Sequence, residues 1–237
     1  MIIGVFLRHI KCYENLNFIQ FVNNLSEMLN VFIGGNGVGK STILESIGYI
    51  LNEVDPKQWD VTISQKKDEA FICPVFLIKK EKFGNSILSK KLEYVSSRFW
   101  DLEYTSQTAT AAKDFVDLKN NLKASIDHSN YYFISIGKKF DSKVIMTSSF
   151  DEKIFSSLKR LGVSRNDIDE LYDEIISRYS YVYIPVESKI RDVLSLQASE
   201  MQSLMDKSVF DEIVKILNRK EHGDNADNDK VSIIYQW

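Results

Sequence analysis

Short apolar runs recur along the chain and predict β-strands. Residues 2–7 and 18–22 are two such runs joined by a polar segment, and they predict a hairpin. Residues 29–33 form a further short apolar run, which predicts a buried strand. Residues 69–80 are strongly apolar, but Pro74 has no N–H to donate, so we expect an edge strand or a bulge there. Further strands are predicted at residues 87–95, 131–136, 143–147, 179–188 and 231–237, with turns at residues 83–86 and 137–139.

Other segments repeat their apolar residues at helical spacing. Residues 43–51 place Ile43, Leu44, Ile47, Ile50 and Leu51 on one stripe, which predicts a helix of about three turns. Residues 111–126 and 149–161 predict two further helices, the second closed by Gly162. Ser164 followed by Asp167 resembles a capping pair at the start of another helix. Residues 190–217 are also helical in pattern, and 222–229 are a polar loop.

Composition and charge leave the class of partner open. The chain has 237 residues, of which 44% are hydrophobic and 27% charged, enough for a substantial core in one domain. The net charge of −3 indicates no global basic field, although a local basic patch could exist. Cys12 and Cys73 match no metal-ligand spacing, and the sequence shows neither a secretory leader nor a long apolar run. We therefore expect a cytoplasmic protein with reduced thiols and no membrane partner.

The most specific motif lies directly after the apolar run at residues 29–33. Gly34, Gly39, Lys40 and Ser41 occupy the fixed places of the phosphate-loop pattern G-x-x-x-x-G-K-[ST], between the predicted strand and helix. Glycines let backbone N–H groups approach a phosphate chain, and the helix start and the lysine add positive charge. We expect ATP to bind here, with Mg²⁺ on the Ser41 hydroxyl; the alternative is a glycine-rich turn without a ligand. The predicted nucleotide contacts are Gly34, Gly35, Asn36, Gly37, Val38, Gly39, Lys40, Ser41 and Thr42.

A predicted hairpin before a phosphate loop separates this chain from kinase-like and Ras-like proteins, which open with the loop strand itself. The hairpin carries the step Lys11-Cys12-Tyr13 and then Leu16, and G-x-N-G-x-G-K-S-T follows. This order resembles the N-terminal half of an ABC-type ATPase head, closest to the branch shared by SMC proteins, RecF and the overcoming-lysogenization-defect (OLD) nucleases. The resemblance implies an α/β fold of the P-loop NTPase class, the N-terminal lobe of an ABC-ATPase head with an antiparallel β lobe and inserted helices.

The resemblance also implies roles for residues outside the loop. The family has an arginine that contacts the nucleotide where this chain has Lys11, which keeps the charge but not the bidentate fork; the alternative is a solvated hairpin lysine. Gln65 is the nearest candidate for the family's glutamine that senses Mg²⁺, against an ordinary loop glutamine. His9 is expected to have a surface or core role. The implied partners are a second copy of the chain in an ATP-dependent homodimer, DNA, and partner defence proteins.

The catalytic residues that the resemblance requires are not recognisable. Residues 194–197 (Leu-Ser-Leu-Gln) lack the glycines of the family's signature segment, and Glu187 follows Pro185 rather than ending an apolar strand as half of an Asp-Glu pair. We therefore expect an ATP-binding lobe at residues 1–190 with a helical insertion near 100–178, and a helical or dimerisation segment at 191–237, with the catalytic half absent. The catalytic residues are unknown. Two functions compete: an ATPase head controlling a DNA-acting or defence nuclease, and an interaction module that binds ATP without hydrolysing it; a phosphate-loop kinase is a weaker third.

Overall fold

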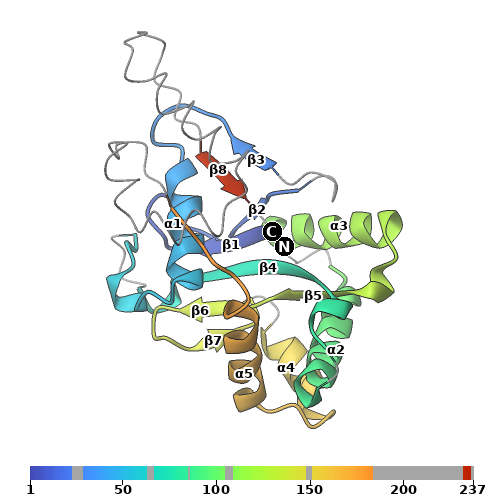
Figure 1. Cartoon of the computed structure of the whole chain (residues 1–237). Coiled ribbons are helices and arrows are strands. Elements are labelled where there is room, and N and C mark those ends of the chain that lie inside the picture. The colour runs from blue at the N-terminus through green and yellow to red at the C-terminus, as the bar shows by residue number, and fades with distance from the viewer. Residues whose placement is uncertain are drawn as a thin grey trace, which may run out of the picture.

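The computed structural model describes residues 1–22, 29–62, 67–84, 86–104, 109–147, 151–183 and 232–235. Figure 1 shows a central sheet with helices around it, and a second, smaller sheet above it. Within the described residues, no helix is both long enough and apolar enough to cross a membrane.

The central sheet has six strands, and every pairing in it is antiparallel. The N-terminal hairpin is confirmed, since β1 and β2 pair with Gly4 opposite Gln20 and Leu7 opposite Asn17. β4 pairs with β1 along one edge, and with β5 and β6 along the other. The strands are β1 (Ile2–Arg8), β2 (Asn17–Gln20), β4 (Phe71–Lys79), β5 (Tyr131–Ser135), β6 (Gly137–Lys139) and β7 (Val144–Ile145).

Pro74 lies in the middle of this sheet, so the predicted edge strand is wrong. Its carbonyl accepts a hydrogen bond from Ile136 N at 3.2 Å. In an antiparallel strand the N–H and C=O of one residue point to the same side. Pro74 has no N–H, so on the side of Ile136 it can accept a hydrogen bond but cannot donate one. The pairing along β4 is interrupted there, which divides β5 from β6. The β1–β4 register does shift, between Ile2 and Gly4 of β1 and opposite Phe76 and Val75, but Pro74 itself pairs with Val5, so the predicted bulge at Pro74 is not found.

Gly137 starts β6 where a turn was predicted, so that prediction is wrong. A Cβ atom at Gly137 would lie 2.0 Å from the carbonyl oxygen of Ile72 and 2.7 Å from the Cα of Cys73. Only glycine allows the two backbones to approach this closely after the interruption opposite Pro74.

The run at residues 87–95, predicted as a strand, is instead the first part of helix α2. Ser86 Oγ accepts a hydrogen bond from Ser89 N at 3.1 Å, and Ser89 Oγ accepts one from Ser86 N at 2.9 Å. This reciprocal capping satisfies two donors at the helix start and favours a helix over a strand. The buried residues Leu92, Val95 and Phe99 then follow at helical spacing.

The other helices agree with their predicted places. The described helices are α1 (Lys40–Leu51), α2 (Ile87–Trp100), α3 (Thr110–Ser125), α4 (Asp151–Lys159) and α5 (Arg165–Ile176), with 3₁₀ turns η1 (Pro56–Gln58), η2 (Lys67–Glu69), η3 (Lys80–Lys82) and η4 (His128–Asn130). The capping pair before α5 is confirmed, since Ser164 Oγ accepts from Asp167 N at 3.2 Å and an Asp167 carboxylate oxygen accepts from Ser164 N at 2.7 Å. α1 packs on β4, α2 on β5 and α3 on β2.

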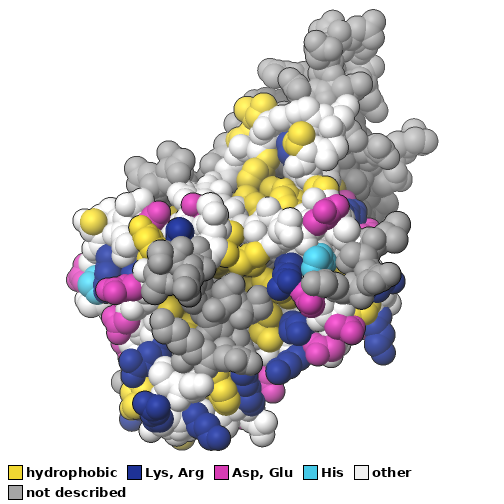
Figure 2. Space-filling view, turned by 180° about the vertical axis from the view of Figure 1, so that it is seen from behind, with side chains coloured by type: hydrophobic (Ala, Val, Ile, Leu, Met, Phe, Trp, Pro, Cys, Tyr) yellow, Lys and Arg dark blue, Asp and Glu magenta, His cyan; other side chains and the backbone are white. Residues whose placement is uncertain are grey.

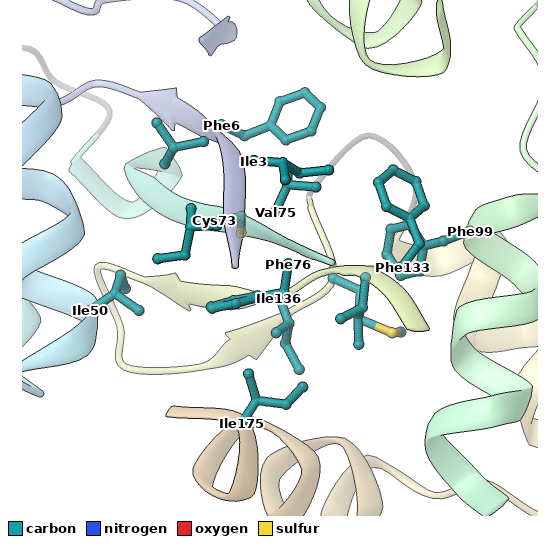
Figure 3. Close-up of a cluster of buried hydrophobic side chains, with 14 of the residues drawn as sticks. Ile3, Phe6, Ile50, Cys73, Val75, Phe76, Phe99, Phe133, Ile136 and Ile175 are labelled. Carbon is teal, nitrogen blue, oxygen red and sulfur yellow. The ribbon is translucent and has the colours of Figure 1, made fainter. Parts of the chain in front are cut away.

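The core is built from the sheet and these helices, and Figure 3 shows part of it, where aromatic side chains such as Phe6 and Phe133 lie among aliphatic ones. Phe133 of β5 stacks on Phe115 of α3 with the ring centroids 5.2 Å apart, and Phe115 meets Phe6 of β1 edge to face, also at 5.2 Å. Both strands β1 and β4 are buried along almost their whole length. The core therefore joins segments that are far apart in sequence.

The strand before the phosphate loop belongs to the smaller sheet. β3 (Leu29–Phe32) pairs antiparallel with β8 (Ser232–Tyr235), so the strands predicted in 29–33 and 231–237 are confirmed over these residues. The predicted burial is wrong, because Val31 is 47% exposed and Ile33 is 78% exposed. Figure 2 shows the molecule from behind. Exposed hydrophobic side chains gather on the upper half of this face, and many charged side chains lie on its lower half.

The described part of the run at residues 179–188 is not a strand. Among the residues that the structure describes, 179–183 pair with no strand, and their tyrosines pack against the core while Val182 is exposed. Tyr181 donates a hydrogen bond from its hydroxyl to Leu44 O at 2.7 Å, which holds this segment against α1. Gly48 makes the contact possible, because a Cβ there would lie 2.9 Å from the Tyr181 ring. The predicted helix at 190–217 and the loop at 222–229 lie outside the described residues.

Candidate nucleotide-binding site

The phosphate loop has a backbone that glycine favours. Gly37 has φ 84° and Gly39 has φ 94°, both in the left-handed region. Gly39 is the N-cap of α1, and Gly39 O accepts the first helical hydrogen bond from Ile43 N at 3.1 Å. The free N–H groups and the positive end of the helix dipole therefore face the loop, as an anion site requires.

Lys40 is turned into this loop rather than toward solvent. The residue is only 8% exposed, and its Nζ donates hydrogen bonds to the carbonyl oxygens of Gly34 and, at 2.8 Å, of Gly35. A buried ammonium needs such partners to offset the loss of water. The loop therefore holds a positive charge at its centre, where it can also meet a bound anion.

A cleft of about 320 Å³ opens beside the loop. This volume lies in the range of sites for small ligands. The lining offers backbone N–H groups, two lysines and two hydroxyl side chains, and this set of donors fits a polyphosphate with its bound metal ion. The lining residues are Lys11, Cys12, Asn36, Gly37, Val38, Gly39, Lys40, Ser41 and Thr42.

The turn of the N-terminal hairpin forms one wall of this cleft by packing on Gly39. Tyr13 Oη donates to Gly39 O at 3.4 Å, and a Cβ at Gly39 would lie 2.8 Å from both Cys12 Sγ and Tyr13 Oη. Burial, followed by the neighbouring Cys12, raises the pKa of Tyr13 to about 12, so the phenol stays protonated and able to donate. The family-like step Lys11-Cys12-Tyr13 and the loop thus meet in space.

Lys11 lines the cleft but is held by two carboxylates. Its Nζ pairs with Glu45 Oε2 of α1 and, at 3.1 Å, with Asp60 Oδ2. Burial lowers the pKa of Lys11, but the bonds to Glu45 and Asp60 outweigh it and raise the pKa overall, so the ammonium stays charged. Sequence analysis missed both carboxylates. The signal for Glu45 is its spacing of four from Ser41, which puts both on one helix face; Asp60 carries no such signal.

The backbone around Lys11 is fixed to the segment before residue 63. Lys11 N donates to Asp60 O at 3.0 Å, Thr62 N donates to His9 O at 2.9 Å, and Thr62 Oγ1 donates to Lys11 O at 2.7 Å. His9 and Lys11 both have positive φ, 54° and 46°, which these bonds hold in place. His9 does not line the cleft; it is 9% exposed and its Nε2 lies 3.9 Å from Glu69 Oε2.

The structure does not test every predicted site residue. Gln65 and Glu187 lie outside the described residues, as do residues 194–197. Ser41 lines the cleft, but within the described part of the chain no three His, Cys, Asp or Glu side chains are grouped to hold a metal ion. The Mg²⁺ site on Ser41 and Gln65 therefore stays a prediction.

Comparison with known proteins decides the family. The sequence profile described as an AAA domain matches residues 5–231, which is nearly the whole chain. The chain belongs to the AAA domain family. This membership agrees with the predicted α/β fold of the P-loop NTPase class.

Individual relatives of this AAA domain protein carry the name RecF. The chain is 21% identical over 242 residues to "DNA replication and repair protein RecF" of Clostridium botulinum (strain Langeland), covering 93% of the chain and 65% of that protein. RecF of Clostridium acetobutylicum is 25% identical over 219 residues, covering 79% of the chain and 53% of that protein. The chain thus spans less than two thirds of the length of these relatives, and no solved structure matches it. These matches support the SMC/RecF part of the resemblance.

Proposed function

We propose that this AAA domain protein binds ATP with Mg²⁺ in the cleft beside the phosphate loop. The observation that carries the proposal is the buried Lys40 ammonium, held inside the loop at the start of α1. The residues at 34–42 surround the phosphates, Lys11 adds a second positive charge, and Ser41 offers its hydroxyl to the metal ion. Bound Mg²⁺ neutralises part of the phosphate charge.

We further propose that ATP binding is coupled to work on DNA, as in an ABC-type ATPase of the SMC/RecF class. Support comes from the family match and from relatives whose name refers to DNA replication and repair. Two copies would close around ATP, and the assembly would include DNA and partner proteins. Control of an OLD-type nuclease in defence against phage is the finest part of the proposal and rests on the sequence resemblance alone.

A specific observation favours the second candidate, an interaction module that binds ATP without hydrolysing it. Among the described residues that line the cleft, none is Asp or Glu. Hydrolysis needs a group that positions the attacking water, and a carboxylate commonly serves this purpose. Phosphate release measured with the 237-residue chain tests the module, because robust turnover would contradict it and favour the ATPase. Binding without turnover is expected of both candidates, since no signature segment or Asp-Glu strand of an ATPase head is recognised in this sequence.

Removal of the Lys40 charge tests the nucleotide site. Lys40→Ala is expected to weaken Mg-ATP binding by about 2–4 kcal/mol, because one partner of a desolvated charge pair is lost. Isothermal titration calorimetry measures the change, and Lys40→Met repeats it with the apolar stem retained. The matched control is Lys57→Ala, which removes an exposed lysine outside the cleft. Unchanged affinity in folded Lys40 variants would contradict the assignment.

Ser41 provides a separate test of the metal ion. Ser41→Ala is expected to weaken ATP binding mainly when Mg²⁺ is present, because the hydroxyl is proposed to contact the metal ion rather than the phosphates. ATP affinity measured with Mg²⁺ and with a chelator isolates this contribution. An equal loss under both conditions would argue against Ser41 as a metal contact.

A further inference from the structure

Lys11, which lines the cleft, lies among more negative than positive charge. Lys11 contributes one ammonium, while Glu45 and Asp60 contribute two carboxylates that both contact it. Tyr49 Oη lies 3.3 Å from Asp60 Oδ2 and donates to it, which fixes that carboxylate further. These three charged groups thus sum to one negative charge beside a cleft that fits a polyphosphate, although only Lys11 of the three lines it.

Lys11 can change partner without any movement of its backbone. Its main chain is fixed by Asp60 O and by Thr62, whereas its side chain is 33% exposed and lines the cleft. Rotation of the side chain alone can therefore carry the ammonium toward a bound phosphate. In doing so it exchanges carboxylate oxygens for phosphate oxygens, and the carboxylates lose their counter-charge.

We infer that Glu45 and Asp60 set the nucleotide affinity of this cleft by holding Lys11 in competition with the phosphates. The inference rests on the proposed function and adds to it two residues that need not touch the nucleotide. They act through Lys11, so they are positioning residues rather than catalytic ones. If the two carboxylates only positioned Lys11 for the nucleotide, removing one would weaken nucleotide binding. The inference predicts the opposite: neutralising either carboxylate releases the ammonium and strengthens nucleotide binding.

The amide variants separate charge from shape. Glu45→Gln and Asp60→Asn keep an oxygen that can accept from Lys11 Nζ, but remove the negative charge that binds and neutralises it. Mg-ATP affinity is expected to rise by about two- to fivefold in each variant, within the range for partly exposed charge pairs. The gain is expected to shrink at high salt, because exposed charges are screened. Both amides are expected to leave Lys11 able to reach the cleft.

The experiment is calorimetric titration of the full chain with Mg-ATP and with inorganic tripolyphosphate. The set comprises the wild type, both amide variants, and each amide combined with Lys11→Met. The control Glu93→Gln breaks a pair with Lys80, 2.8 Å long, which lies away from the cleft lining. Thermal unfolding of every variant confirms that it is folded at the temperature of titration.

The outcomes are distinct. Stronger binding in the amide variants that disappears with Lys11→Met, and is absent in Glu93→Gln, supports the inference. Unchanged or weaker binding in the amide variants overturns it, provided that the wild type binds in a Lys40-dependent manner. A gain that persists with Lys11→Met also overturns it, since repulsion alone would then account for the effect. Absence of Lys40-dependent binding in the wild type overturns the proposed function itself.

Discussion

The six-stranded sheet and the phosphate-loop region are built on different principles. In the sheet, β1 and β4 are buried almost completely. Aromatic rings from β1, β5 and α3 pack against one another there. In the loop region, β3 has one partner strand among the described residues, and Val31 and Ile33 are exposed. Packing therefore constrains the sheet, whereas backbone conformation and charge constrain the loop.

Glycine shows the same contrast. Gly137 in the sheet is needed for space, because the backbone of β4 lies where its Cβ would be. Gly37 in the loop is needed for its positive φ, and a Cβ there would meet no atom within 4 Å. Changes in the sheet should therefore affect stability, and changes in the loop should affect binding.

The largest expected effect is the loss of a core ring. Phe133→Ala removes a fully buried side chain that stacks on Phe115, and it should lower the free energy of unfolding by about 3–5 kcal/mol. Chemical denaturation followed by circular dichroism measures the change. Val182→Ala, at an exposed position, is the control and should change stability by less than about 0.5 kcal/mol. A small loss at Phe133 would contradict the packing described here.

A single chemical change made in both regions sharpens the comparison. Gly137→Ala forces a Cβ to within 2.0 Å of Ile72 O, and should lower the free energy of unfolding by about 2–4 kcal/mol. Gly35→Ala meets no atom within 4 Å and has no positive φ, so stability should change by about 0.5 kcal/mol or less. Equal losses in the two variants, measured by denaturation, would remove the distinction between the regions.

The smallest effect concerns the N-terminal cap of α5. The hydrogen bond from Lys91, followed by those of Ser164, lowers the pKa of Asp167. Because the folded-state pKa is depressed, its contribution is complete above the unfolded value near 4 and is lost as the pH falls through the folded value. Asp167→Ala should cost about 0.5–2 kcal/mol at pH 7.

The free energy of unfolding, measured as a function of pH, tests whether the contribution of Asp167 is lost as the pH falls. The difference between the wild type and Asp167→Ala should narrow as the pH falls below about 4. Asp169→Ala, which changes an exposed carboxylate two positions along the same helix, is the matched control. A difference that stays constant over this range would show that the carboxylate charge contributes nothing.

Features whose determinants lie close together in the chain could be predicted from the sequence. The phosphate loop has fixed spacing between Gly34 and Ser41, and the cap of α5 depends on Ser164 and Asp167, which are three residues apart. Each can therefore be recognised within one short stretch of sequence. The start of α2 was equally local, but the apolar character of residues 87–95 obscured the Ser86 and Ser89 cap. The cap, rather than the apolar character of the run, therefore decides that this segment is a helix.

Other features depend on contacts that no local pattern reports. The central position of Pro74 follows from strands β1 and β5, which come from distant parts of the chain. The pair between Lys11 and Glu45 spans 34 residues, and Asp60 joins it from a further segment. The family resemblance predicts that Lys11 lies beside the cleft. Its two carboxylate partners could be identified only from the structure.

The contact of Cys12 and Tyr13 with Gly39 has a consequence for how the site is assembled during folding. The glycine-rich segment carries its own sequence pattern, but one wall of its cleft comes from a turn that is made much earlier in the chain. A peptide containing only β3, the loop and α1 would keep the motif and lose the wall. The binding cleft is thus a product of tertiary folding, and it can form only when the N-terminal hairpin has docked.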